Sequence, residues 1–227
     1  QFPANELAPQ AQWWVADYYY AKEDYAAAEL NYKQLFNTWS RDALAPEARM
    51  MAGRAAVAWS NYENAFEHFT SLTLDTNCPP ALWGQAMSAF GGALMKSPPP
   101  ENDKLGNLKE ALTVYKVLAE TSAKKYPTNE LTAAAWGELG NCALQLADYT
   151  TASDAYHKAM TFHTASVEVR SAARVGLVIV LNRVVVPQWR TDFDKRTLEA
   201  NGEIVVGVDE VARNLEGPLA IPVCVRI

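Results

Sequence analysis

The stretch from Trp136 to Met160, WGELGNCALQLADYTTASDAYHKAM, constrains the fold of this chain more than any other. Leu139 follows Trp136 by three residues and Ala143 follows Leu139 by four, so these side chains share one helix face. Gly140 removes a side chain from that helix, which lets a second helix come close. After a turn, small and aromatic residues recur at helical spacing: Tyr149, Ala152, Ala155, Tyr156 and Ala159. The stretch therefore predicts a hairpin of two helices.

Parts of this pattern recur earlier in the chain. Tyr62 and Ala65 each lie 37 residues after Tyr25 and Ala28, so a row of residues shifts together along the sequence. A shared offset of this kind indicates a structural repeat, because a single matching aromatic residue occurs easily by chance. We predict that one small residue in each unit marks an equivalent close contact between helices: Ala28, Ala65, Ala111 and Ala152.

The spacing of Trp136, Leu139, Gly140, Ala152 and Tyr156 resembles that of the tetratricopeptide repeat (TPR) family. The resemblance implies an all-α fold, a TPR-type α-solenoid of about four helix–turn–helix units in residues 1–182. The units are expected near 9–40, 46–77, 79–127 and 129–164, followed by an extra or capping helix at 166–182.

Two segments of this region depart from a regular repeat. Residues 97–106, SPPPENDKLG, are predicted to form an inserted loop, because three consecutive prolines cannot continue a helix. Residues 175–181 are apolar on every side of the predicted last helix, so we expect that helix to be covered on both sides.

Residues 183–227 carry no repeat pattern and are predicted to be a separate C-terminal extension. It contains a candidate short helix at 193–200 and two candidate strands, at 203–208 and 220–227. Its sequence VVGVDEVARNLEGPLAIPVCV resembles the opening segment of ribonuclease HII, in which paired acids bind catalytic metal ions. The matching acids are Asp209 and Glu210.

The ribonuclease resemblance is incomplete. Ala212 and Ile221 replace glycines of that family, and residues 214–216 interrupt its glycine turn. The further acids of that family find no counterpart in this segment, so two carboxylates stand without the partners that the metal chemistry needs. The alternative reading is therefore a TPR module fused to a partial, inactive nuclease segment, while the extension can also supply a strand pair for oligomerisation. The oligomeric state is left open.

Composition and motifs argue against several other functions. The net charge of −6 and the lack of a Lys/Arg run disfavour nucleic-acid binding. The longest apolar run, 175–181, is far shorter than the roughly 20 residues of a membrane-spanning helix. The three histidines, predicted to be exposed or half-buried, lack the spacing of a metal pair: His68, His157 and His163. Cys142 is predicted to be a small buried residue, and no phosphate loop or nucleophile elbow occurs.

These observations predict a non-enzymatic interaction module without a cofactor or catalytic residues. The TPR resemblance implies that the first helix of each unit lines a concave face that binds a peptide or a partner protein. By register, the residues expected on that face are Trp13, Asp17, Tyr20, Met50, Arg54, Val57, Gly137, Asn141, Leu144 and Gln145. Tyr126-Pro127 and the aromatic-rich helices resemble bacterial cell-envelope TPR proteins, which implies the periplasm or the cell envelope as the location.

Overall fold

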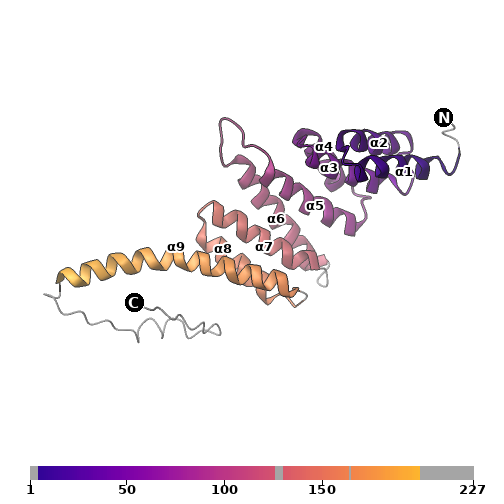
Figure 1. Ribbon diagram of the computed structural model, residues 1–227. Helices are drawn as coiled ribbons and strands as arrows, with labels where there is room; N and C mark the ends of the chain where they lie inside the picture. The colour runs from indigo at the N-terminus through magenta and orange to yellow at the C-terminus, as the bar shows by residue number, and fades with distance from the viewer. Residues whose placement is uncertain (1–4, 126–129, 164, 200–227) are drawn as a thin grey trace. The chain divides into compact units, whose positions relative to one another are not determined.

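The computed structural model describes residues 5–125, 130–163 and 165–199. Over these ranges the chain is all-helical, with nine helices and no strand (Figure 1). In order they are α1 (Ala8–Ala21), α2 (Tyr25–Thr38), α3 (Ala45–Ala58), α4 (Tyr62–Leu74), α5 (Pro80–Lys96), α6 (Gly106–Lys125), α7 (Glu130–Gln145), α8 (Tyr149–Thr161) and α9 (Val167–Glu199). The candidate strands at 203–208 and 220–227, and the acids Asp209 and Glu210, lie outside the described residues.

Three of the helix hairpins use the same turn. A residue with left-handed φ follows the first helix of each: Glu23 (61°), Ser60 (68°) and Ala147 (58°). The next residue caps the second helix, because its side-chain oxygen accepts a hydrogen bond from a backbone N–H three positions on: Asp24 from Ala27, Asn61 from Asn64 and Asp148 from Thr151. The recurrence shows that local turn chemistry is repeated along the chain.

The third hairpin has a longer connection, as predicted from its prolines. It runs between α5 and α6, and its start is tied to the following helix. The Asn107 side-chain amide donates to Ser97 Oγ at 2.7 Å and to the Pro98 carbonyl at 3.0 Å. Lys109 pairs with Asp103 at 3.1 Å. These bonds hold both parts of the loop against α6.

Close approach between the two helices of a hairpin is also repeated. A Cβ atom at Gly53 would lie 2.5 Å from the Phe69 ring, and one at Gly140 would lie 2.6 Å from the Tyr156 ring. Gly91 has the same relationship to Tyr115 in the third hairpin, at 2.6 Å. The small residues predicted at close contacts are all completely buried: Ala28, Ala65, Ala111 and Ala152.

Consecutive helices from α1 to α8 pack against one another in chain order (Figure 1). In addition, α3 contacts α5 and α5 contacts α7, so alternate helices are also neighbours. Their apolar side chains form three buried clusters along the chain, the largest of which includes Leu118, Trp136 and Tyr156. This packing is compatible with a helical repeat.

The chain divides into two compact units, Gln1–Leu181 and Asn182–Ile227, and the division falls within α9. This helix is longer than the predicted helix at 166–182, because it continues without a break through residues 183–199. The repeat pattern fades near residue 182, yet the loss of an inward-facing pattern does not remove the backbone hydrogen bonds that propagate a helix.

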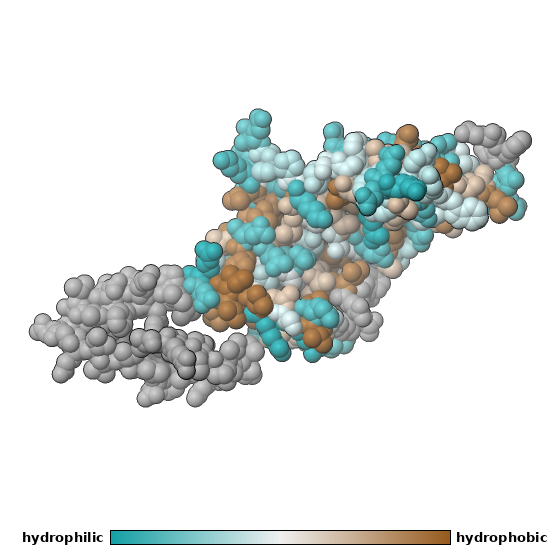
Figure 2. Space-filling view, in the orientation of Figure 1, coloured by the Kyte–Doolittle hydropathy of each residue, from teal (hydrophilic) through white to brown (hydrophobic). Residues whose placement is uncertain are grey.

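The expectation that α9 is covered on both sides is wrong. Gly176 and Val180 are buried, and Gly176 lies against the Tyr156 ring of α8. On other sides of the helix, Val175 is 60% exposed and Ile179 is 39% exposed. Figure 2 shows apolar residues at the surface in this part of the molecule. Among the described residues, no helix combines the length and hydropathy needed to cross a bilayer.

Candidate binding surface

The predicted binding residues of α1 are held in place by α2. The Trp13 ring packs edge-on against Tyr32 with centroids 5.3 Å apart, and Tyr20 packs in the same way against Tyr25 at 5.2 Å. Asp17 accepts a hydrogen bond from the Tyr32 hydroxyl. Trp13, Asp17 and Tyr20 are each partly exposed, so their fixed side chains still reach the surface.

The three predicted residues of α3 occupy different environments. Arg54 is exposed, and its Nη2 donates to Gln85 Oε1 of α5 at 3.3 Å. Val57 is partly buried against the core. Met50 is only 2% exposed and belongs to the same core as Phe69, so it offers no contact to a surface ligand. Helical register alone placed Met50 on the expected binding face, whereas neighbouring helices cover its side chain.

On α7, Asn141 is engaged within the protein. Its Oδ1 accepts from the Tyr156 hydroxyl at 2.7 Å, and its Nδ2 donates to Glu138 Oε2 at 3.1 Å. Leu144 is partly buried and Gln145 is exposed. Gly137 is open, because no atom outside its own turn of helix lies within 4 Å of the position that its Cβ would take.

The first and fourth hairpins share a polar contact that sequence reasoning missed. In each, a buried tyrosine of the second helix bonds a polar residue fifteen positions earlier on the first helix: Tyr32 to Asp17, and Tyr156 to Asn141. Burial raises the pKa of Tyr156 to about 12, and burial together with the bond to Asp17 raises the pKa of Tyr32 well above its usual range. Asp17 and Asn141 therefore already have intramolecular partners.

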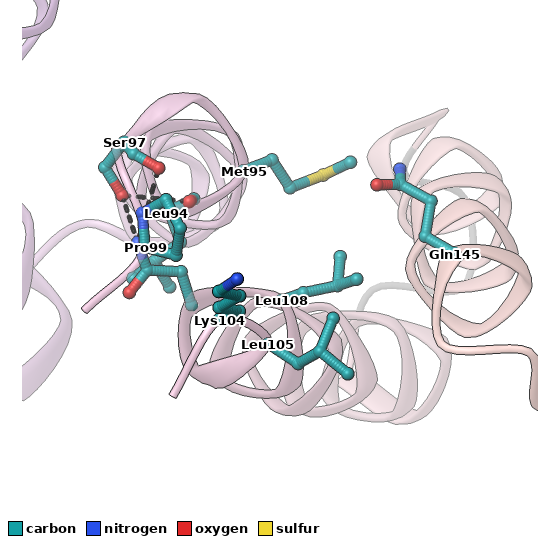
Figure 3. Close-up of a pocket in the computed structure, with 9 residues that line it drawn as sticks. Leu94, Met95, Ser97, Pro99, Lys104, Leu105, Leu108 and Gln145 are labelled. Carbon is teal, nitrogen blue, oxygen red and sulfur yellow. Dashed lines mark hydrogen bonds between the residues drawn. The ribbon is translucent and has the colours of Figure 1, made fainter. Parts of the chain in front are cut away.

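A shallow cavity of about 360 Å³ lies where the inserted loop meets α7 (Figure 3). Leu105 at the end of the loop and Leu108 of α6 point into it, Met95 of α5 lies beside it, and Gln145 faces Met95 across it. The sequence predicted the inserted loop, and it predicted Gln145 as a residue of the binding face. It did not predict that both line one cavity, because α5, α6 and α7 bring them together only in the folded chain.

A polar cluster joins the first and second hairpins. Glu29 and His68 are buried in it, Asn64 is partly buried and Trp59 is 45% exposed. Glu29 Oε2 accepts from Trp59 Nε1 at 2.7 Å, and Glu29 Oε1 accepts from Asn64 Nδ2 at 2.6 Å. His68 Nε2 lies 3.3 Å from the same Oε1. Glu29 is 4% exposed and His68 is 1% exposed. The prediction of an exposed or half-buried His68 is therefore wrong.

Burial also characterises the thiol on α7. Cys142 is completely buried, as predicted, and burial raises its pKa to about 12. Its Sγ lies 3.7 Å from Met95 Sδ. Within the described ranges, no three His, Cys, Asp or Glu side chains are grouped so that they could hold a metal ion.

No protein-family model matches the sequence, and no curated protein matches it either. The residues of α1, α3 and α7 and their geometry are therefore the basis for a function of this candidate surface.

Proposed function

We propose that this chain is a non-enzymatic scaffold, a TPR-type solenoid that binds a peptide or a partner protein on the face formed by the first helices of its hairpins. The observation that carries the proposal is the contact of α3 with α5 and of α5 with α7. Because alternate helices are neighbours, their outward side chains form one continuous row. The hydrogen bond from Arg54 to Gln85 links two helices of that row.

The chemistry of this row suits an extended peptide with apolar side chains. On α7, Leu144 is partly exposed and gives the row aliphatic contact area. On α1, Trp13 and Tyr20 are partly exposed and add aromatic area to the proposed face. Arg54 adds an exposed cation, which favours a carboxylate on the partner. Trp13 and Tyr20 are already fixed by ring contacts with α2, so binding costs them little conformational entropy.

Selection from a displayed random-peptide library, followed by titration of the selected peptides, tests the proposal. The variants Arg54→Ala and Gln145→Ala remove exposed side chains of the row and leave the core intact. We expect each to weaken binding by roughly tenfold. Glu67→Ala on α4 removes an exposed side chain from the second helix of a hairpin and serves as the matched control. Selected peptides that bind all three variants as well as the parent would contradict the assignment of this face.

The nuclease alternative has its own test. Cleavage of an RNA–DNA junction duplex in Mn²⁺, lost on Asp209→Ala, would overturn the scaffold proposal.

The proposal also includes a bacterial cell-envelope location, supported by the Asp-Tyr turns at Asp24 and Asp148 and by the aromatic-rich helices. Detection of the protein in the cytoplasmic fraction alone would remove that part.

A further inference from the structure

The outer face of α1 carries a regular row of exposed side chains. Its members are spaced alternately by four and three residues, the spacing of a helix–helix contact. They are Leu7, which caps the start of α1, and Ala11, Trp14, Tyr18 and Ala21, here called the α1 seam. Leu7 is 68% exposed, Trp14 is 72% exposed and Tyr18 is 59% exposed. Large apolar and aromatic side chains in a continuous exposed row mark an interaction surface.

The α1 seam is distinct from the face that contacts the rest of the protein. Pro9 and Ala16, on the opposite side of the helix, are buried, and α1 packs against α2. Trp13 and Tyr20 of the proposed peptide face are also turned toward α2 residues. An occupant of the seam therefore competes neither with the core nor with the peptide face, and the inference is independent of the proposed function.

We propose that the α1 seam binds the α1 seam of a second copy of this chain, with the two helices antiparallel about a two-fold axis. In this arrangement the axis passes between Ala11 and Trp14, so each Trp14 lies opposite Ala11 of the other copy. Leu7 then lies opposite Tyr18 at both ends of the contact. Large residues face small ones at the centre, which is how packed helices interdigitate.

The charges of α1 are compatible with this pairing. The α1 seam contains no ionisable side chain apart from the Tyr18 phenol, so pairing buries no ion. Lys22 lies just beyond the C-terminal end of the seam, with its ammonium 5.8 Å from the centre of the Tyr18 ring. Antiparallel pairing places the two Lys22 side chains at opposite ends of the contact, which avoids repulsion between them.

The contact is small, because one helix from each copy supplies it, so the dimer is expected to be weak. Sedimentation velocity of the full chain from about 1 to about 300 µM should show a monomer–dimer equilibrium. Trp14→Ala leaves Ala opposite Ala, and Ala11→Trp places Trp opposite Trp. We expect either substitution to weaken dimerisation by roughly tenfold or more.

The double variant with Ala11→Trp and Trp14→Ala exchanges the two sizes and keeps large opposite small. We expect it to restore the dimer. Leu74→Ala removes a 76% exposed leucine from α4 and should leave the dimer unchanged. Helical content by circular dichroism shows that each variant is folded. A monomer at every concentration, a dimer that survives Trp14→Ala, or a folded double variant that stays monomeric would each overturn the proposal.

Discussion

Gly140 of α7 lies directly against the ring of Tyr156 of α8, so that a Cβ atom at Gly140 would stand 2.6 Å from Tyr156 Cε1. On α9, a Cβ at Gly176 would overlap the same ring. Tyr156 is 1% exposed and has little room to move. A glycine is therefore required at both contacts for steric reasons.

Replacement of Gly140 by leucine is expected to lower the free energy of unfolding by about 1–3 kcal/mol, because the added side chain overpacks the contact with Tyr156. Urea denaturation measures the change. Gly137→Ala in the same helix is the control, since no atom outside that turn of helix lies within 4 Å of the new Cβ. It should raise the free energy of unfolding by about 0.5–1 kcal/mol through helix propensity. Equal effects from the two substitutions would show that Gly140 is not at a close contact.

We expect a glycine in place of Ala147 to stabilise the fold. Its φ of 58° is a left-handed conformation that costs a residue with a Cβ about 1 kcal/mol. Ala147→Gly should raise the free energy of unfolding by about 0.5–1 kcal/mol, as measured by thermal or urea denaturation. Ala26→Gly, at an exposed position within α2, should lower it by a similar amount. A destabilised Ala147→Gly variant would contradict the turn geometry.

The Glu29 carboxylate accepts hydrogen bonds from Trp59 and Asn64 and lies beside His68 Nε2, so its removal breaks contacts with three side chains. Glu29→Ala should lower the free energy of unfolding by about 1–3 kcal/mol, because the partly buried Asn64 Nδ2 and the buried His68 lose a hydrogen-bond partner, whereas Trp59, 45% exposed, can bond water instead. Glu67→Ala, on the exposed side of α4, is the control and should change stability by less than about 0.5 kcal/mol. Comparable losses in both variants would show that the polar cluster does not stabilise the fold.

The pH dependence of stability should report on His68. Burial lowers the pKa of His68, while the neighbouring Glu29 opposes that shift. Below the usual histidine pKa of about 6.5 the unfolded chain takes up a proton more readily than the folded chain. The contribution of neutral His68 is therefore present above that pH and is lost as the pH falls through the folded-state pKa.

Urea denaturation at about pH 7.5 and about pH 5.5 should accordingly show a larger loss of stability in the parent chain than in His68→Gln, which does not titrate. The exposed His157→Gln is the control and should behave as the parent does. Equal losses in the parent and in His68→Gln would mean that His68 keeps its ordinary pKa.

Local chemistry explains which parts of the fold were predictable. The helices follow the spacing of apolar residues, and the turns follow Asp24, Asn61 and Asp148, each of which bonds a backbone N–H three positions on. Prolines marked the loop in the third hairpin. These signals lie within a few residues of their effects, so they can be read from the chain.

The environment of the candidate binding residues was less predictable. Register identified the first-helix residues, yet it did not distinguish exposed Arg54 from buried Met50, which lie four positions apart on α3. It also did not show that Asp17 and Asn141 are already bonded to Tyr32 and Tyr156. Exposure depends on how closely the neighbouring helices approach.

The sequence by itself determined the helices, three of the hairpin turns and the close approach at Gly140, because each depends on residues within one hairpin. Only the tertiary structure decided that Glu29 and His68 meet, since they are 39 positions apart and belong to different hairpins. It also decided that Val175 and Ile179 remain exposed. Burial depends on contacts between helices, and a local pattern does not specify which helix supplies them.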